Sequence, residues 1–394
     1  AVPGGSKQAF CNRNSLTKGY SSSLCLFRRH KPWGRRPREP KGIALTNSAI
    51  LDLARRTFLR DVPLDACAVR GFGHPDTRII RPGVSHEGFI GDAVCTIGAF
   101  DGVHRGHRYL FQATIQDARR RGVPSVILTF DPDPDELFFP TARIHKLLNN
   151  EDRLSFLTKF GADFVVCLPF NRELAAHSTE AFFKTYVFPT FMPKAIHVGA
   201  DFKLGAGNAG NVAELRQLGS VRGRSWEVNG YDLLCNKAAP VSATRIRHLL
   251  IDEGDCRSAN NLLQRAHFVR GTVVRGRQKG RTFGFPTANV SLSYPYVVPA
   301  EGVYAGLVLV DGVAWPSAIN VGIPRTFADE PNCASIEANM VGFNEDIYGR
   351  EVAVAFIEKL RGQQKFASLG ELMAAVNGNI DWVRTNIGPT GFRI

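Results

Sequence analysis

Residues 93–107 read AVCTIGAFDGVHRGH, and this stretch indicates the fold of the first half of the chain. Its apolar start, from Ala93 to Phe100, is short and ends at small residues, which is typical of a buried strand. A helical pattern follows at about 105–121, and a second apolar run at 123–130 predicts the next strand. A strand, a helix and a second strand in succession predict a parallel sheet.

The same alternation continues as far as residue 265. Two further strands are predicted at Asp163–Pro169 and Ala195–Gly199. We therefore expect a Rossmann-like α/β domain over residues 90–265, with helices covering both faces of a parallel sheet. The predicted helices lie at about 150–160, 177–187, 211–218, 242–251 and 255–263.

A different pattern begins at residue 266, where short β-branched runs are separated by Gly and Pro turns. Such spacing predicts an antiparallel β-barrel or sandwich over residues 266–394. Ser368 and Glu371 form a capping box, which predicts a closing helix through about residue 377. The predicted strands are His267–Val274, Gly302–Val310, Val313–Asn320, Ala334–Val341 and Glu351–Ile357.

The composition is that of a soluble globular protein with two or three domains, because 44% of the 394 residues are hydrophobic and 22% are charged. No apolar run approaches the roughly 20 residues that span a bilayer, which excludes a transmembrane protein. The eight cysteines form no CxxC pairs and have no nearby histidine partners. This excludes a zinc finger or a disulfide framework and favours a reducing compartment, so we expect a cytoplasmic protein.

The net charge of +13 is concentrated at one end of the chain. Residues 1–50 hold ten Lys or Arg against one acid, Glu39, so the remainder carries only +4. The first 45 residues are also rich in Gly, Ser, Pro and Arg, and we expect residues 1–89 to form a basic, largely disordered extension. It could be an organelle transit peptide, a nucleic-acid arm or upstream sequence outside the working protein.

The first strand meets its helix at two histidines and several glycines. Ligands bind at such points in parallel α/β sheets, and the free N–H groups of a helix N-terminus attract phosphates. Gly98, Gly102 and Gly106 would let the backbone approach a phosphate closely. His104 and His107 fall on one face of the first helical turn and could donate hydrogen bonds to a departing pyrophosphate. The two histidines could instead bind a metal or simply lie on the surface.

A second glycine-rich segment opens the predicted barrel. It runs from Gly271 through Gly276 and Gly280 to a polar pair, Thr287 and Asn289. Glycine loops can cradle phosphates through backbone N–H groups, and Thr and Asn oxygens suit Mg²⁺ beside a nucleotide. The alternative is that these glycines only form hairpin turns of a barrel.

Several motifs carry a resemblance to a known family. GAFDGVHRGH (98–107) resembles the signature of the nucleotidyltransferase superfamily, and FDGVH resembles in particular the adenylyltransferase half of bacterial bifunctional riboflavin kinase/FAD synthetases. In the second half, GRTFGFPTANV resembles the riboflavin kinase signature. The likeness extends from about residue 90 to 380. Further similar segments are GADFVVCLPFNRELA (161–175), HVGADFKLGAGNAGN (197–211), VSATRIRHLL (241–250), GVYAGLV (302–308) and residues 337–366.

The resemblance implies that the first domain transfers AMP from ATP to FMN. His104 and His107 would be catalytic, and Arg247 would neutralise the charge of the leaving group, a task that suits the arginine side chain. Without the resemblance, Ser242 would be read as an ordinary helix N-cap. The implied nucleotide-binding positions are Gly98, Phe100, Asp101, Gly106, Asp201, Ser242 and Thr244.

The resemblance also implies that the second domain phosphorylates riboflavin with ATP. Glu337 would accept the proton of the ribityl 5′-hydroxyl as that oxygen attacks the γ-phosphorus. Thr287 and Asn289 would hold Mg²⁺ at the phosphates. The further implied binding positions are Gly271, Gly276, Gly280, Arg281, Gly284 and Pro286.

The sequence departs from the family pattern at four places. Asp133 stands where the family has a His, and an anion there should weaken phosphate binding unless a cation or Mg²⁺ intervenes. Ala243 replaces a common Ser and removes a hydroxyl donor. Pro324-Arg325-Thr326 reverses the usual order of this loop, and Asn339 stands where His or an aromatic residue is common.

The sequence thus predicts a bifunctional enzyme that makes FMN and then FAD, using Mg²⁺, with riboflavin, FMN and ATP as substrates. One alternative is a riboflavin kinase with an impaired adenylyltransferase half, and another is a nucleotidyltransferase for a different phosphate acceptor. A nucleic-acid-binding protein that uses residues 28–41 is a third. Because the basic charge is local, we expect small-molecule partners rather than nucleic acid or membrane, and a homo-oligomer remains open.

Overall fold

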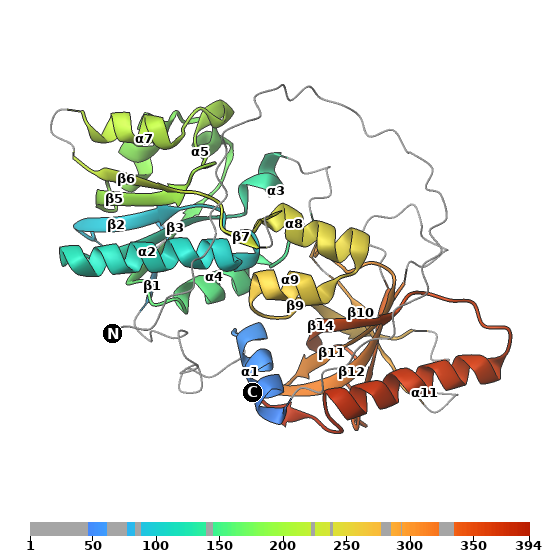
Figure 1. Cartoon of the computed structure of the whole chain (residues 1–394). Helices are drawn as coiled ribbons and strands as arrows, with labels where there is room; N and C mark the ends of the chain where they lie inside the picture. Colours follow the sequence, from blue (N-terminus) through green and yellow to red (C-terminus); the bar gives the residue numbers. More distant parts are fainter. Residues whose placement is uncertain are drawn as a thin grey trace, which may run out of the picture.

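The computed structural model of this chain describes residues 46–60, 77–82, 88–138, 145–221, 225–236, 239–276, 285–292, 294–322 and 335–394. These residues form a parallel α/β domain followed by an antiparallel barrel with a long C-terminal helix (Figure 1). Both predicted architectures are therefore confirmed.

Six parallel strands form the first sheet, in the order β1-β4-β3-β2-β5-β6. The central strands are buried along most of their length, as expected for a parallel sheet with helices on both faces (Figure 1). The strands are β1 (Arg78–Ile80), β2 (Asp92–Ile97), β3 (Ser125–Asp131), β4 (Phe164–Pro169), β5 (Met192–Gly199) and β6 (Glu227–Tyr231). Sequence reasoning missed β6, because its EVNGY sequence lacks an apolar run.

The strand order reverses beside β2. The strands β3 and β4 lie on one side of it, and β5 and β6 lie on the other. In such a sheet a crevice opens beyond the carboxyl ends of the strands at the reversal. The segment that follows β2 therefore lies at the crevice, as the motif analysis predicted.

Helices and short turns connect these strands. The helix α2 (Arg105–Arg121) follows β2 and ends at Gly122, whose φ of 66° forms a left-handed cap. The other helices are α3 (Pro134–Phe138), α4 (Asn150–Thr158), α5 (Arg172–Ala176), α6 (Thr179–Phe182), α7 (Val212–Gly219), α8 (Ala243–His248) and α9 (Cys256–Leu263). The shorter elements are η2 (Asp101–Val103), η3 (Phe183–Val187), η4 (Ala206–Asn208), η5 (Leu249–Glu253), β7 (Cys235–Asn236) and β8 (Ala239–Pro240).

Strands β9 to β14 form a closed antiparallel barrel, and the β11–β12 pair completes the circle. Sequence reasoning missed β10, because it has only four residues and two of them are polar. The strands are β9 (His267–Val274), β10 (Ala288–Ser291), β11 (Gly302–Val310), β12 (Val313–Gly322), β13 (Ser335–Met340), β14 (Glu351–Arg361) and β15 (Phe392–Arg393), which pairs with β12.

The closing helix α11 (Leu369–Asn386) starts at the predicted capping box but runs beyond residue 377. The hydroxyl of Ser368 accepts from the backbone N–H of Glu371, and the Glu371 carboxylate accepts from the N–H of Ala367. Within the described residues, no helix has the length and hydrophobicity needed to cross a membrane.

Part of the N-terminal extension expected over residues 1–89 lies within the described residues. There α1 (Asn47–Thr57) is a helix, and β1 pairs with β4 of the first sheet. The first 45 residues, which carry most of the basic charge, lie outside the described residues. The prediction for residues 1–89 relied on the charge and composition of the first 45 residues. It therefore overlooked the amphipathic NSAILDLARRT sequence of α1.

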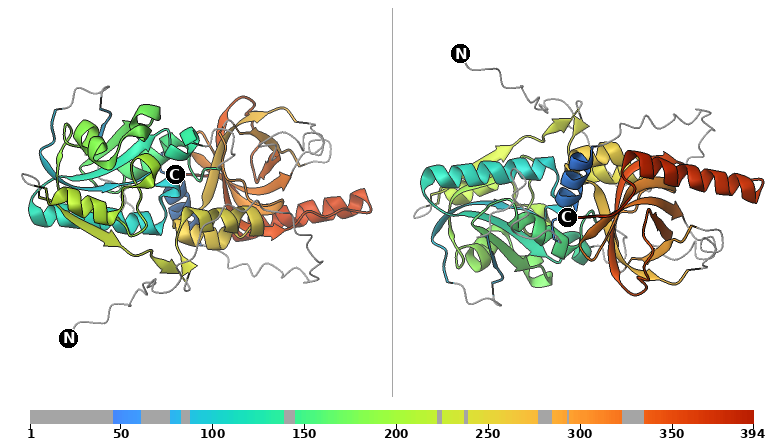
Figure 2. Two further views of the ribbon diagram at one scale, coloured as in Figure 1. Left: turned by 90° about the horizontal axis from the view of Figure 1, so that it is seen from above. Right: turned by 90° about the horizontal axis from the view of Figure 1, so that it is seen from below.

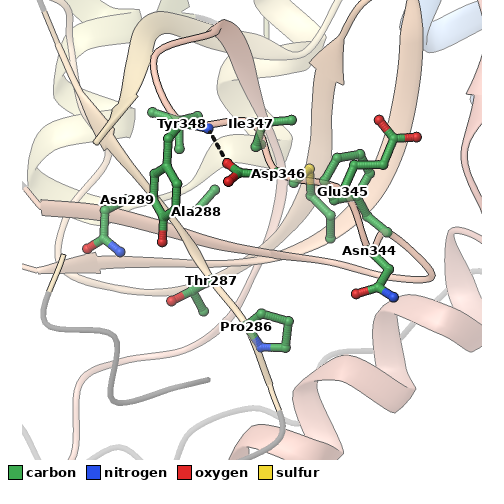
Figure 3. A pocket seen from close by; sticks show the side chains of 12 residues that line it. Pro286, Thr287, Ala288, Asn289, Asn344, Glu345, Asp346, Ile347 and Tyr348 are labelled. Carbon is green, nitrogen blue, oxygen red and sulfur yellow. Dashed lines mark hydrogen bonds between the residues drawn. The ribbon is translucent and has the colours of Figure 1, made fainter. Parts of the chain in front are cut away.

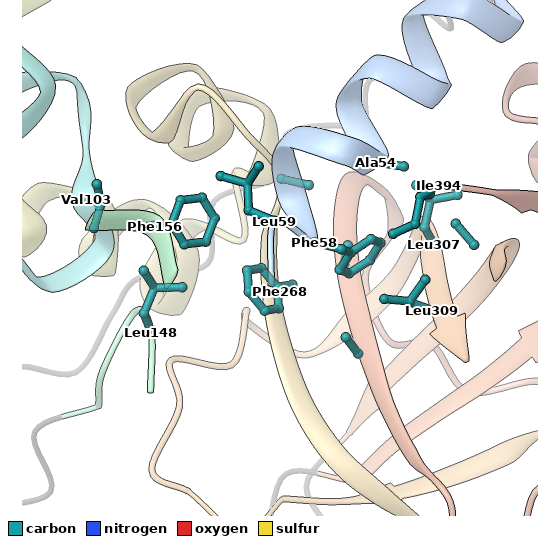
Figure 4. Packing of buried hydrophobic residues seen from close by; sticks show 14 of the residues in the cluster. Ala54, Phe58, Leu59, Val103, Leu148, Phe156, Phe268, Leu307, Leu309 and Ile394 are labelled. Carbon is teal, nitrogen blue, oxygen red and sulfur yellow. The ribbon is translucent and has the colours of Figure 1, made fainter. Parts of the chain in front are cut away.

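Helix α1 lies between the two domains (Figure 2). Phe58 is fully buried, and its ring packs edge-on against Phe268 of β9 with centroids 5.7 Å apart. The same apolar cluster contains Phe156 of α4 and Leu307 of β11, so both domains share one core (Figure 4). Arg60 adds ion pairs to Glu151 of α4 at 2.8 Å and to Glu351 of β14 at 3.4 Å.

Candidate active sites

A cavity of about 350 Å³ opens at the carboxyl ends of β2, β3, β5 and β6. Residues that follow these strands form its walls, as expected at a reversal of strand order. Thr244, which was predicted to bind phosphate, is not among the lining residues. The predicted site residues that line the cavity are Gly98, Phe100, Asp101, His104, Gly106, His107, Asp201, Ser242 and Arg247.

The turn between β2 and α2 delivers the two histidines to this cavity. The backbone is left-handed at Phe100 (φ 57°) and at Gly102 (φ 74°), where a Cβ would lie 2.6 Å from a Leu147 methyl carbon. His104 then occupies the N-cap of α2, and His107 lies in its first turn. Their rings stack with centroids 3.6 Å apart and an angle of 22° between the planes.

Both imidazoles are neutral at neutral pH. Burial lowers the pKa of His104 to about 3, and the guanidiniums of Arg265 and Arg247 contribute to that lowering. Burial, together with the neighbouring His104, also holds the pKa of His107 well below its ordinary value. Among the described residues, neither Nδ1 atom has a hydrogen-bond partner. Since buried polar atoms are normally paired, this pair of rings retains hydrogen-bonding capacity for a ligand.

Arg247 is held in place by the protein. Its Nη2 atom lies 2.5 Å from Asp101 Oδ2, and its Nε donates to the carbonyl oxygen of His145 at 2.8 Å. The other oxygen of Asp101 accepts from the N–H groups of Leu147 and Leu148 at 3.1 and 3.3 Å. Asp101 therefore anchors Arg247 at the cavity, which is a role that its position in the motif did not reveal.

Ser242 has both of the roles that were considered for it. It is the N-cap of α8, where its hydroxyl accepts from the backbone N–H of Arg245 at 3.2 Å, and it also lines the cavity. Ala243, the second departure from the family pattern, lines the wall beside it. The predicted loss of a hydroxyl donor is therefore located at the cavity itself.

A lysine side chain pairs with the carboxylate of Asp133, so this anion has the cation that phosphate binding nearby was expected to need. Asp133 is 3% exposed and lines the cavity, and its Oδ1 lies 2.8 Å from the Nζ of Lys146, which is 1% exposed. The Nη1 of Arg153 lies 3.8 Å from its other oxygen. A buried carboxylate requires such a partner.

Sequence reasoning missed several of the residues that line the cavity. Phe202 follows β5, and Tyr231 and Leu234 lie at or after the end of β6. A ligand in the cavity would meet these apolar and aromatic side chains as well as the histidines. Because β6 was not predicted, the residues at its end carried no signal.

The barrel contains a second cavity, of about 500 Å³. One part of its wall is the segment 286–289, which includes the predicted residues Pro286, Thr287 and Asn289 (Figure 3). Another part is the loop 343–348 before β14, which was not predicted. The Asp346 carboxylate accepts from the N–H of Tyr348 at 3.0 Å and shapes this loop.

Glu337 lies in a row of polar side chains beside this cavity. It pairs directly with Asn289 across β10 and β13, and with Asn320 across β13 and β12. Directly paired residues project from the same face of a sheet. Glu337 is half-buried and is not among the residues that line the cavity. Its neighbour on the sheet, Asn289, does line the cavity, so Glu337 lies one side chain away from it.

The remaining residues that were singled out in the kinase half have different surroundings. Gly276 lies against Asn289, since a Cβ at 276 would come within 2.5 Å of the Asn289 amide. Gly271 instead lies inside β9, where a Cβ would come within 2.4 Å of the Ser291 carbonyl oxygen, so its absence of a side chain serves strand packing. Asn339 donates to the carbonyl oxygen of Pro286 at 2.8 Å and so supports the cavity wall. Gly280, Arg281, Gly284 and the 324–326 loop lie outside the described residues.

The donor set of the barrel cavity fits Mg²⁺. Thr287 and Asn289 present a hydroxyl and an amide oxygen, which are hard ligands of the kind that Mg²⁺ prefers. Across the described ranges, no cluster of three or more His, Cys, Asp or Glu side chains could hold a metal. A magnesium ion here would therefore need phosphate and water oxygens as its other ligands.

Comparisons with known proteins identify relatives of both domains. A family model described as FAD synthetase matches residues 88–245, and one described as riboflavin kinase matches residues 263–387. The bifunctional riboflavin kinase/FMN adenylyltransferase of Escherichia coli (strain K12) is 36% identical over 284 residues, which cover 72% of this chain and 89% of that protein. The protein of the same name from Pseudomonas fluorescens is 34% identical over 314 residues, covering 80% and 97%.

One solved structure resembles most of the chain. It is titled a macrolide-efflux protein from Streptococcus pneumoniae, is 30% identical in sequence and has a TM-score of 0.69. The match covers 78% of this chain and 98% of that one. The arrangement of the two domains thus has a close structural counterpart.

Proposed function

Because this chain belongs to the family of bifunctional riboflavin kinase/FMN adenylyltransferases, we propose that each of its two cavities carries one of the two reactions. The protein phosphorylates riboflavin to FMN with ATP, and it joins FMN to AMP from a second ATP to form FAD and pyrophosphate. The barrel cavity is the site of phosphorylation, and the cavity beside His104 is the site of adenylyl transfer. The ranges of the two family models support this assignment, since one range contains the lining of the barrel cavity and the other contains the lining of the first cavity except for Arg247.

Adenylyl transfer requires a site that stabilises a departing pyrophosphate. An oxygen of the FMN phosphate forms a bond to the α-phosphorus of ATP, and the bond from that phosphorus to the bridging oxygen of the β-phosphate breaks. His104 and His107, as neutral rings, donate hydrogen bonds to the phosphate oxygens on which charge increases. Arg247, which lies in the last turn of α8 and is oriented by Asp101, neutralises that charge.

Riboflavin phosphorylation requires a base next to the γ-phosphate. Glu337 accepts the proton of the ribityl 5′-hydroxyl as that oxygen attacks the γ-phosphorus, and ADP leaves. Its position beside Asn289, directly across the ladder, places the carboxylate next to a residue of the cavity wall. Thr287 and Asn289 would hold Mg²⁺, which would supply charge neutralisation at the phosphates.

A cytoplasmic location forms part of the same proposal. In the described part of the chain, Cys95, Cys167, Cys235 and Cys256 form no disulfide bonds with one another. Burial raises the pKa of Cys95 and Cys256 far above the ordinary value, so both are unreactive thiols. These properties suit a reducing compartment.

The observation that supports the assignment most is the stacked, buried His104–His107 pair at the reversal of strand order, whose Nδ1 atoms have no hydrogen-bond partner among the described residues. The test supplies FMN, ATP and MgCl₂ to the wild type, H104A and E337A, and measures FAD by chromatography. We expect H104A to lose FAD formation and E337A to retain it. Riboflavin phosphorylation by the same preparations is the matched control. In that reaction we expect H104A to retain activity and E337A to lose it. Full FAD formation by H104A would contradict the proposal.

A further inference from the structure

Residues 145–148, which we call the strap, contact both domains and the adenylyl-transfer cavity. On the barrel side, the N–H of Lys146 donates to the carbonyl oxygen of Pro295, and the carbonyl oxygen of Lys146 accepts from the N–H of Val297, both at 2.8 Å. On the cavity side, the strap binds Asp101 through two backbone N–H groups and binds Arg247 through a carbonyl oxygen. The position of the strap therefore determines where Asp101 and Arg247 lie.

The side chain of Lys146 fixes the strap to the loop after β3. Its Nζ lies 2.8 Å from Asp133 and 3.2 Å from Asp135, and only 1% of the lysine side chain is exposed. Asp133 is also buried, and its Oδ1 accepts from the N–H of Asp135 at 3.1 Å. A buried ammonium and carboxylate at this distance restrict each other strongly, because separating them leaves an uncompensated charge.

We propose that Lys146 is a positioning residue for adenylyl transfer, which acts through the strap on Arg247. The chain of contacts runs from Asp133 to Lys146, along the strap backbone, and to Asp101 and Arg247. This inference rests on the proposed assignment of the cavity beside His104 to adenylyl transfer. Asp133 then serves as the counter-ion of a buried lysine, which accounts for an acidic residue at the position where the family has a histidine.

The contacts predict which kinetic constant changes. Arg247 neutralises charge that develops as pyrophosphate leaves, so its displacement weakens an interaction of the transition state more than the binding of either substrate. A displacement of about 1 Å in such a group lowers the rate by up to about a hundredfold. We therefore expect K146M to lower the kcat of FAD formation by tenfold to a hundredfold, with the KM values for FMN and ATP within about threefold of the wild type.

The experiment is a double-mutant cycle on the full chain, with FMN, ATP and MgCl₂ as reactants. K146M, D133N and R247A are assayed singly, together with K146M/R247A, and riboflavin phosphorylation by each preparation reports on folding. Asp152→Asn is the matched control, because it breaks another buried ion pair, with Arg270, that does not involve the strap. We expect this variant to keep the wild-type ratio of the two activities.

If Lys146 acts through Arg247, K146M and D133N lower the kcat of FAD formation to a similar level, and K146M has no further effect in the R247A background. The inference is overturned if K146M forms FAD at the wild-type rate, or if it lowers kcat by the same factor with and without Arg247. A failure of the cavity assignment is distinguished by H104A, which would then form FAD normally.

Discussion

The replacement of Phe58 by alanine tests whether the segment around α1 holds the two domains together. Phe58 is fully buried, and it packs against Phe268 of the barrel within a cluster that contains Phe156 of the α/β domain. Removal of a buried phenylalanine ring costs about 3–5 kcal/mol of the free energy of unfolding. That is a large share of the roughly 5–15 kcal/mol that stabilises an ordinary protein.

The ion pairs of Arg60 contribute far less to the free energy of unfolding than the Phe58 ring does. The Arg60 side chain is 33% exposed, and its partners Glu151 and Glu351 are 76% and 57% exposed. Exposed pairs of this kind contribute about 0–1 kcal/mol. The apolar contact of Phe58 therefore dominates, and we expect R60A to be close to the wild type in stability.

The assay measures thermal unfolding of F58A together with the loss of each activity on heating. We expect the midpoint to fall by about 6 °C or more, and both activities to be lost at the same lower temperature. F89A is the matched control, because Phe89 is 56% exposed and its truncation should change stability by about 0.5 kcal/mol or less. Unfolding of F58A at the wild-type temperature would refute the reasoning, and so would a shift in only one of the two activities.

Two further predictions concern acid stability and the barrel cavity. Burial lowers the pKa of His104 to about 3 and the pKa of His267 to about 4. Below about pH 6.5 the unfolded chain therefore binds more protons at these histidines than the folded chain does. The free energy of unfolding should therefore fall between pH 6.5 and 4, by up to about 1.4 kcal/mol per pH unit for each histidine, and urea midpoints that are equal at pH 7 and pH 5 would contradict this. N339A removes the hydrogen bond to the Pro286 carbonyl. It should raise the KM for ATP in riboflavin phosphorylation several-fold and leave FAD formation from FMN unchanged, whereas an equal loss in both reactions would exclude a local role for Asn339.

Local sequence patterns predicted most of the α/β sheet and the barrel. The short apolar run that ends at the small residues Gly98 and Ala99 favours a buried strand that leads into a turn and a helix. The histidines of the motif therefore came to the cavity as expected. The elements that escaped prediction are short or polar, such as β10 and β6, and tertiary pairing rather than local pattern stabilises them.

The interactions inside each site could not be predicted, because they join distant segments of the chain. The departure at Asp133 could be recognised from the family pattern, but its partner Lys146 comes from another segment, which only the fold brings within 2.8 Å. In the same way, Asp101 was predicted to bind nucleotide, and only the structure shows that one of its carboxylate oxygens holds Arg247. The row of Asn289, Glu337 and Asn320 depends on strand register, which is set by the whole barrel.

Mixing two inactivated variants tests most directly whether this one chain contains two independent sites. H104A and E337A are supplied with riboflavin, ATP and MgCl₂, separately and in an equal mixture, and the flavins are separated by chromatography. The account predicts FMN alone from H104A, neither product from E337A, and FAD from the mixture after a lag in which FMN accumulates. Formation of FAD from riboflavin by either variant alone, or its absence from the mixture, would contradict the account.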